Sequence, residues 1–423
     1  MDQSILQRRQ MEAKGRIKRP DGLPSLGLAM IVKNEAQNLP YSLGPLAPYV
    51  EQIVCLDTGS EDDTSLVAAG YGAEVHCKEW TGDFSEARNR SLDLMRTDHV
   101  MWLDADNSLS LADLGIIRDK LSGGPQIIVA TEVVVPQGDK LWQKRVFFNS
   151  PEVRFQGTVH EQLSHPADWP VEVSIAQIRH WGYADAASAR RKGQRNLELL
   201  ISAPETAAGD FYHLYQTGRT LFNLRFLAEA EDYLLKAALG QEKRISEDSV
   251  ALLSDIENPS LWSHALILMA QARSRQGKLS GAEAALRFLV RTRPDYGPGR
   301  AALGKYLYDS GLMREAAVEM ERALALGCGD PGWGADPVKQ GFQTACQLAK
   351  ANEKLGRTGE AFRAWKAASR LDPDHPEPYV AMAENSMAGG DRSLAKELIS
   401  VAISLAPAHR RALSLSVSLE AGL

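Results

Sequence analysis

The sequence predicts an α/β domain with a mixed sheet, followed by an all-α solenoid of repeats. Two observations carry this prediction. In the first part, short apolar runs alternate with segments of helical periodicity, which is typical of a sheet with helices on both faces. In the second part, equivalent residues recur at intervals that include two of 34 residues, which is typical of a helical repeat protein. A chain of 423 residues is long enough for two or three such domains.

Within the α/β part, the apolar runs predict strands and the amphipathic segments predict helices. The first strands are expected at 26–32, 51–58, 73–78 and 99–106, with helices at 35–46, 62–70 and 83–97 between them. Four later runs predict strands joined by turns: 126–135, 141–149, 154–163 and 173–181. The alternating half predicts parallel pairing, and the later half is expected to complete a mixed sheet and one wall of a cleft.

From about Asp210 the pattern is helical and periodic. Small residues stand at equivalent places, each followed four residues later by a large apolar one: Ala230, Ala282, Ala316, Ala361 and Ala395, then Leu234, Leu286, Met320, Trp365 and Ile399. Glycine precedes the last four alanines by five residues, at Gly277, Gly311, Gly356 and Gly390. Proline follows three of the alanines by twelve residues, at Pro294, Pro373 and Pro407. Small residues allow close helix packing, glycine allows the turn, and proline ends the second helix, so the pattern resembles the tetratricopeptide repeat.

The repeat pattern has two irregularities. Arg225 stands where the first repeat should have its glycine, and longer spacings imply insertions near 240–260 and 327–337. The expected domain organisation is a basic flexible leader at 1–24, the α/β domain with a linking helix at 25–205, five repeats at 206–407, and a capping helix at 408–423.

Composition excludes several classes of protein. A net charge of −6 argues against general nucleic-acid affinity, although the basic leader and the run Arg190–Lys192 leave a local site open. No apolar stretch is long enough for a membrane span, and the leader lacks a signal-peptide core. Four widely spaced cysteines, without a Cys-x-x-Cys pair, favour buried thiols in a reducing cytoplasm.

The most informative motif is Asp104-Ala105-Asp106, which ends an apolar run at the predicted fourth strand. Residues i and i+2 of an extended chain point the same way, so both carboxylates are expected to reach one hard cation or its water shell. An Asp-x-Asp pair by itself is more often part of an ordinary turn.

Further polar residues follow the other predicted strands. Glu35 comes after the first strand and Asp57 after the second. Ligands of open parallel sheets bind beyond the carboxyl ends of the strands, so these acids and the Asp-x-Asp pair are expected to share a site.

Together these segments resemble glycosyltransferase family 2, which has the GT-A fold, a Rossmann-like mixed sheet. The resemblance covers roughly 25–205 and rests on ordered motifs: Met30–Glu35, Asp57–Ser60, Trp80 with Asp83–Asn89, Asp104–Asp106, Arg145–Phe147, Gly157–Glu161 and His180–Tyr183. Combined with C-terminal tetratricopeptide repeats, the chain is similar to bacterial members of the sublancin S-glycosyltransferase type.

The resemblance implies a UDP-sugar donor and Mn²⁺ or Mg²⁺. It implies that Asp57 and Glu35 contact the nucleotide, that Arg88 contacts the base or diphosphate, and that Asp104 and Asp106 hold the metal. His180 is a further candidate for the metal or diphosphate, with a core histidine as the alternative. Family members invert the sugar configuration, and Glu161, beside His160, is the candidate general base. Asn107 stands where relatives usually carry another acid.

The leading hypothesis is a cytoplasmic, metal-dependent hexosyltransferase that modifies a peptide or protein. A groove of the repeats would position the acceptor, with Tyr215, Arg219, Lys305 and Tyr308 as candidate contacts. One alternative keeps the chemistry but takes a glycan, a lipid carrier or a modified nucleic-acid base as acceptor. Another makes the chain an inactive transferase that acts as an adaptor. The repeats either bind the acceptor or join copies of the chain into a homo-oligomer. The sugar and the acceptor atom, whether oxygen, sulfur or nitrogen, stay open.

Overall fold

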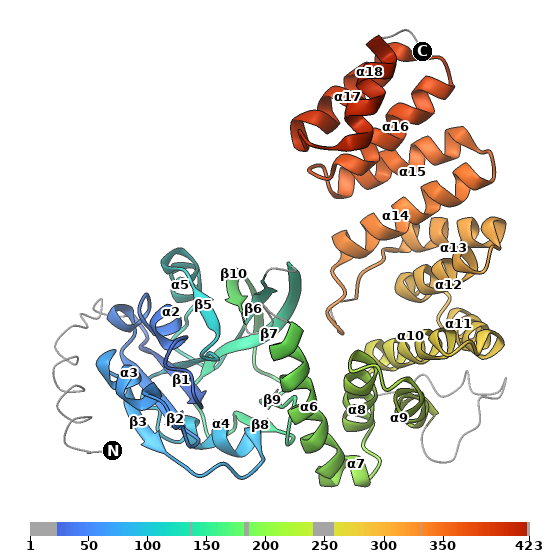
Figure 1. Ribbon diagram of the computed structural model, residues 1–423. Coiled ribbons are helices and arrows are strands. Elements are labelled where there is room, and N and C mark those ends of the chain that lie inside the picture. Colours follow the sequence, from blue (N-terminus) through green and yellow to red (C-terminus); the bar gives the residue numbers. More distant parts are fainter. Residues whose placement is uncertain (1–22, 136–137, 182–185, 240–257, 331, 421–423) are drawn as a thin grey trace. The chain divides into compact units, whose positions relative to one another are not determined.

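A computed structural model describes residues 23–135, 138–181, 186–239, 258–330 and 332–420 (Figure 1). The chain divides into two compact units, 1–224 and 225–423. This division lies beyond the expected domain boundary at residue 205, because the linking helix packs against the helices that follow it inside the first unit. Most of the basic leader and most of the first predicted insertion fall outside the described residues.

The first unit is built on an eight-stranded mixed sheet with the order β3-β2-β1-β4-β7-β6-β10-β5. Its strands are β1 (Leu26–Val32), β2 (Gln52–Asp57), β3 (Glu74–Cys77), β4 (His99–Trp102), β5 (Asn107–Leu109), β6 (Ile127–Val134), β7 (Asp139–Phe148) and β10 (Val171–His180). Parallel pairing joins β1 to β2 and β4, and β2 to β3, whereas β7 runs antiparallel to β4 and β6. The expected mixed sheet is therefore confirmed.

Helices cover both faces of this sheet. One apolar cluster joins the sheet to α2 (Leu39–Leu43), α3 (Thr64–Gly70) and α5 (Leu111–Arg118). A second cluster joins it to α4 (Phe84–Leu92) and to a hairpin of β8 (Arg154–Gln156) and β9 (Gln162–Ser164). The unit ends in α6 (Ala186–Ser202), α7 (Pro204–Ala207) and α8 (Phe211–Asn223).

Two local predictions were wrong, and one helix was not predicted. The helix expected at 35–46 is only α2, followed by a short 3-10 turn at Ala47–Tyr49, because Pro45 has no backbone N–H with which to continue the helix. The strand expected at 154–163 is the β8–β9 hairpin, whose loop contains Gly157 and His160 at positive φ. Helix α5 was not predicted, although Ser110 caps it by accepting a hydrogen bond from the backbone N–H of Asp113.

The second unit is a stack of helices in which neighbours in the chain pack together from α10 to α18 (Figure 1). These helices are α9 (Leu227–Leu239), α10 (Pro259–Arg275), α11 (Leu279–Thr292), α12 (Gly297–Asp309), α13 (Met313–Leu326), α14 (Pro337–Lys354), α15 (Thr358–Leu371), α16 (Pro376–Ala388), α17 (Arg392–Leu405) and α18 (Arg410–Glu420). None of the helices in the described ranges is both long and apolar enough to span a bilayer.

The predicted repeat positions have the expected structural roles. All five marker alanines are 0% exposed, and the large apolar residues that follow them are buried. Gly277, Gly311, Gly356 and Gly390 all adopt φ between 69° and 83° at the turn between paired helices. Arg225 has φ 71°, so the first repeat makes the same turn without glycine.

Candidate active site

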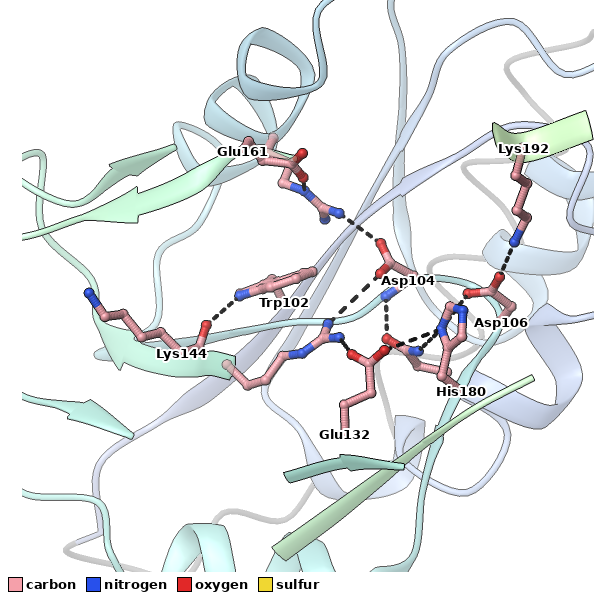
Figure 2. A network of polar contacts seen from close by, with 11 residues as sticks. Trp102, Asp104, Asp106, Glu132, Lys144, Glu161, His180 and Lys192 are labelled. Atoms are coloured by element: carbon pink, nitrogen blue, oxygen red, sulfur yellow. Dashed lines mark hydrogen bonds and ion pairs between the residues drawn. The ribbon is translucent and has the colours of Figure 1, made fainter. Parts of the chain in front are cut away.

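The two carboxylates of the Asp-x-Asp motif lie just beyond the carboxyl end of β4, in a turn rather than in the strand. The backbone N–H of Asn107 donates to the carbonyl of Asp104 at 2.9 Å, and the Asn107 side chain accepts from the Asp104 N–H at 3.1 Å. The expectation of an extended i, i+2 pair was therefore wrong. The turn gives Asp104 and Asp106 different partners (Figure 2).

Asp104 is held by two arginines. Its Oδ1 accepts a hydrogen bond from Nη2 of Arg88 at 2.8 Å, and its Oδ2 lies 3.9 Å from Nη1 of Arg145. Burial alone raises the pKa of this carboxyl, but Arg88 and then Arg145 outweigh burial and lower the pKa to about 2. Asp104 is therefore a carboxylate at any physiological pH.

Arg88 joins Asp104 to the candidate base. Its Nε donates to Glu161, whose side chain is 11% exposed, while its Nη2 holds Asp104. Its guanidinium carbon lies 4.2 Å from the centroid of the Trp102 ring, and the Trp102 N–H donates to the carbonyl of Lys144 at 2.7 Å (Figure 2). The planar fork of arginine suits such a bridge between two carboxylates.

Asp106 faces a different set of groups. Nζ of Lys192, on α6, lies 2.7 Å from Oδ2, and Nδ1 of His180 lies 3.5 Å from Oδ1 (Figure 2). The side-chain amide of Asn107 lies 2.8 Å from the same Nδ1, so position 107 orients the histidine.

A buried ion pair connects the two halves of the site. Arg145 is 1% exposed and donates to Glu132, and Glu132 lies 3.7 Å from Nδ1 of His180. The guanidinium carbon of Arg145 is also 3.7 Å from the Trp102 centroid. In sequence order the chain of contacts thus links Arg88, Asp104, Asp106, Glu132, Arg145, Glu161, His180 and Lys192.

Sequence reasoning did not assign site roles to Glu132, Arg145 and Lys192. A charged residue inside an apolar strand is a usable signal, and Glu132 on β6 is of that kind. Arg145 gave no such signal, because it follows Gln143 and Lys144 in the polar part of β7. Lys192 gave no such signal, because a lysine in a basic helical run is usually solvated.

The two nucleotide candidates lie at neighbouring strand ends. Glu35 follows β1; burial raises the pKa of its carboxyl, a hydrogen bond from Asn38 opposes this shift, and the charge of Asp106 adds to it. Asp57 ends β2, is 4% exposed, and accepts hydrogen bonds from the backbone of Gly59 and Ser60 and from the Ser65 hydroxyl. Asp57 thus organises its own loop in this structure.

His160 lies toward α8. It has φ 57°, and its carbonyl accepts from the Tyr212 hydroxyl at 3.0 Å and from the Gln162 amide at 3.2 Å. Burial, reinforced by the positive charge of Arg219, lowers the pKa of its imidazole to about 4. Of the predicted groove residues, Tyr215 is 0% exposed and cannot line a surface, whereas Lys305 is exposed and pairs with Asp309.

The acids of the site fit a divalent cation as partial ligands. Within the described residues, no three His, Cys, Asp or Glu side chains converge on one point as a complete protein cage. Mg²⁺ commonly takes one or two carboxylates together with substrate phosphates, and Asp104 and Asp106 offer oxygens of that type. His180 contributes a nitrogen beside Asp106.

Comparisons with known proteins identify the family that the first part of the chain resembles. Residues 28–173 match the model of glycosyl transferase family 2. The chain is 32% identical to a TPR repeat-containing protein of Synechococcus elongatus, over 44% of this chain and 50% of that protein. It is 27% identical to the glycosyltransferase SunS of Bacillus phage SPbeta, over 52% of this chain and 54% of that protein.

The chain thus spans about half the length of these curated relatives. Among solved structures it is similar to YrrB, a TPR protein with an unusual peptide-binding site, at 18% identity and a TM-score of 0.36, over 50% of this chain and 94% of that chain. The family match covers β1 to β9, which carry both aspartates and the Arg88–Glu161 bridge. The N-terminal part of the chain is therefore a glycosyltransferase family 2 domain with the GT-A fold, and tetratricopeptide repeats follow it.

Proposed function

We propose that this protein is a metal-dependent, inverting glycosyltransferase that moves a sugar from a UDP-sugar to a peptide or protein. One observation supports it above the others: Arg88 binds both Asp104, on the proposed donor side, and Glu161, the proposed base. A single side chain thus fixes the relative positions of the groups that must act on donor and acceptor.

In the proposed mechanism each residue has a distinct role. Asp104 and Asp106, with His180 beside Asp106, would hold Mn²⁺ or Mg²⁺ with the donor diphosphate, and the cation would supply positive charge against the departing nucleotide. Glu35 and Asp57, at the ends of β1 and β2, are proposed to contact the nucleoside. Glu161 accepts the proton of the acceptor nucleophile on the face opposite the leaving group, which inverts the sugar configuration.

His160 and Arg88 support this chemistry from either side of the base. The depressed pKa of His160 keeps its imidazole neutral near pH 7, so it adds no positive charge beside Glu161. Arg88 orients Glu161 and Asp104 through its fork, and its stacking over Trp102 restricts its own movement.

The acceptor is proposed to be a peptide or protein held by the repeats. Lys305 on α12 and Lys354 on α14 are exposed, and Nζ of Lys354 lies 4.4 Å from the centroid of the Tyr308 ring. Solenoids of paired helices present such side chains along extended surfaces that bind peptides. If the repeats instead join copies of the chain, sedimentation of the protein alone would give a dimer or larger species.

The test is donor binding and hydrolysis across UDP-, GDP- and TDP-sugars, with Mn²⁺, Mg²⁺ or EDTA. Wild type is compared with Asp106→Asn and with Asp119→Asn, a matched acid-to-amide change at an exposed position at the end of α5. We expect metal-dependent binding of UDP-sugars, weakened at least tenfold in Asp106→Asn and unchanged in the control. Failure of wild type to bind any nucleotide sugar would reject the proposal and favour a role as an adaptor.

A further inference from the structure

We propose that Lys192 is a donor-binding residue that neutralises Asp106 before the donor arrives and moves to the donor diphosphate when a divalent cation takes Asp106. The proposal rests on the proposed function, because it requires a nucleotide diphosphate and a cation at this site. It assigns a role to α6, which lies beyond the matched family region of 28–173.

The contact between Lys192 and Asp106 occupies the carboxylate that a metal ion needs. Nζ lies 2.7 Å from Oδ2, and the Asp106 side chain is 11% exposed, so the ammonium covers a carboxylate that is otherwise largely buried. Two cations at one carboxylate oxygen repel each other, and this repulsion is strong where water is scarce. A divalent cation that binds Oδ2 must therefore displace the ammonium.

The three permanent cations of the network differ in their freedom to move. Arg88 and Arg145 have side chains 9% and 1% exposed, both stack over Trp102, and each contacts two carboxylates. Lys192 is 32% exposed and ends in a compact ammonium on a flexible four-carbon stem. Moving the Lys192 side chain to a new partner therefore disturbs less buried structure than moving either stacked arginine would.

The part of α6 that follows Lys192 is anchored by two contacts. Three residues further along α6, the guanidinium carbon of Arg195 lies 5.2 Å from the centroid of the Phe84 ring. Leu199, one turn beyond, lies against Gly82. Because these contacts hold the helix next to α4, a change of side-chain torsions is enough to carry Nζ from Asp106 to a phosphate bound beside it.

Charge balance gives the exchange its direction. Among the described residues the network brings together four carboxylates and three permanent cations, with His180 between Asp106 and Glu132. The site therefore keeps a net negative charge, which attracts a divalent cation, and the ammonium of Lys192 offsets part of that charge and so weakens the binding of the cation alone. Mn²⁺ with a diphosphate adds little net charge, and the released ammonium gains a phosphate oxygen as its new partner.

The experiment measures two affinities. The first is that of Mn²⁺ alone, followed by electron paramagnetic resonance, and the second is that of UDP at saturating Mn²⁺. Lys192→Met is compared with wild type. We expect Mn²⁺ alone to bind about tenfold more tightly to the variant, and UDP with Mn²⁺ to bind about tenfold more weakly. The two shifts have opposite signs, whereas general damage to the site would weaken both.

Arg190→Met is the matched control, because it removes a positive charge from an exposed position of the same helix. Both affinities should stay at the wild-type value in this variant. Lys192→Arg should retain most of the UDP affinity, since it keeps the charge.

If wild type binds Mn²⁺ and UDP but Lys192→Met does not shift the two affinities in opposite directions, the role of Lys192 is refuted while the proposed function stands. If wild type binds neither Mn²⁺ nor UDP, the proposed function fails and this inference falls with it.

Discussion

A single residue, Ala105, separates two aspartates whose surroundings have little in common. Asp104 is fixed by Arg88 and Arg145, and its low pKa keeps it charged. Asp106 faces Lys192 and His180, one flexible and the other able to ligate a metal as a neutral ring. The two aspartates thus differ in their surroundings: two buried arginines hold Asp104 in place, whereas Asp106 faces a lysine with a more exposed side chain.

The buried imidazole of His160 predicts that the stability of the protein depends on pH. The pKa of the imidazole is about 4 in the folded chain and about 6.5 in the unfolded chain, so between these values only the unfolded chain binds a proton. The contribution of neutral His160 to the free energy of unfolding is complete above pH 6.5. It is lost as the pH falls toward 4, by up to about 3 kcal/mol. His160→Asn should flatten this part of the profile of unfolding free energy against pH.

Asparagine is the appropriate replacement because it tolerates the left-handed backbone at φ 57° and does not titrate. The comparison uses the slope between pH 4 and 6.5, measured by urea unfolding, so that a constant loss of packing in the variant has no effect. Parallel profiles for the two proteins would show that His160 does not titrate as described.

At the scale of elements, the sequence predicted strands more accurately than their connections. Buried strands such as β1 and β2 are continuous apolar runs, and that signal is local. The turn at Asp104–Asn107 is closed by a backbone hydrogen bond and by a hydrogen bond to the Asn107 side chain, and the β8–β9 loop has two residues at positive φ. The spacing of acidic residues does not carry that information, so the sequence did not predict the turn that gives the two carboxylates different partners.

The turn of the first repeat has an arginine, Arg225, at the position where the later repeats have glycine. Arg225 adopts φ 71°, where glycines stand in the four later turns and where a side chain costs about 1 kcal/mol. Burial and the charge of Arg225 both lower the pKa of Arg275, so the two arginines also repel each other. Arg225→Gly should therefore raise the free energy of unfolding of the repeat unit by about 1 kcal/mol.

Gly277→Ala is the converse change. An added Cβ at Gly277 would meet no atom within 4 Å, so this variant tests backbone strain alone and should lose about 1 kcal/mol. Urea unfolding of the full-length variants measures both effects. A stability of Arg225→Gly equal to or below that of wild type would mean that contacts of the arginine outweigh the strain.

At the scale of the whole molecule, each apolar cluster found among the described residues lies within one of the two units. The sheet clusters lie wholly within 26–178, and the clusters of the later helices lie within 308–419. The change from strand–helix alternation to a helical period indicated two parts, but the expected boundary at residue 205 differs from the division at residue 224. The network that includes Lys192 was not predictable, because it joins residues up to 86 positions apart whose proximity depends on the folded sheet and on α6.

Separate clusters predict that donor binding stabilises one unit and leaves the other unchanged. A ligand at 100 times its dissociation constant stabilises the state that binds it by about 2.7 kcal/mol. UDP with Mn²⁺ should therefore slow backbone amide hydrogen exchange in peptides of the first unit. The effect should be largest in β1, β4 and β7 around the site. Peptides from α10 to α18 should exchange at the same rate with and without ligand. Equal protection of the repeat helices would show instead that the two units unfold as one cooperative body, and the repeats would then sense the occupancy of the donor site.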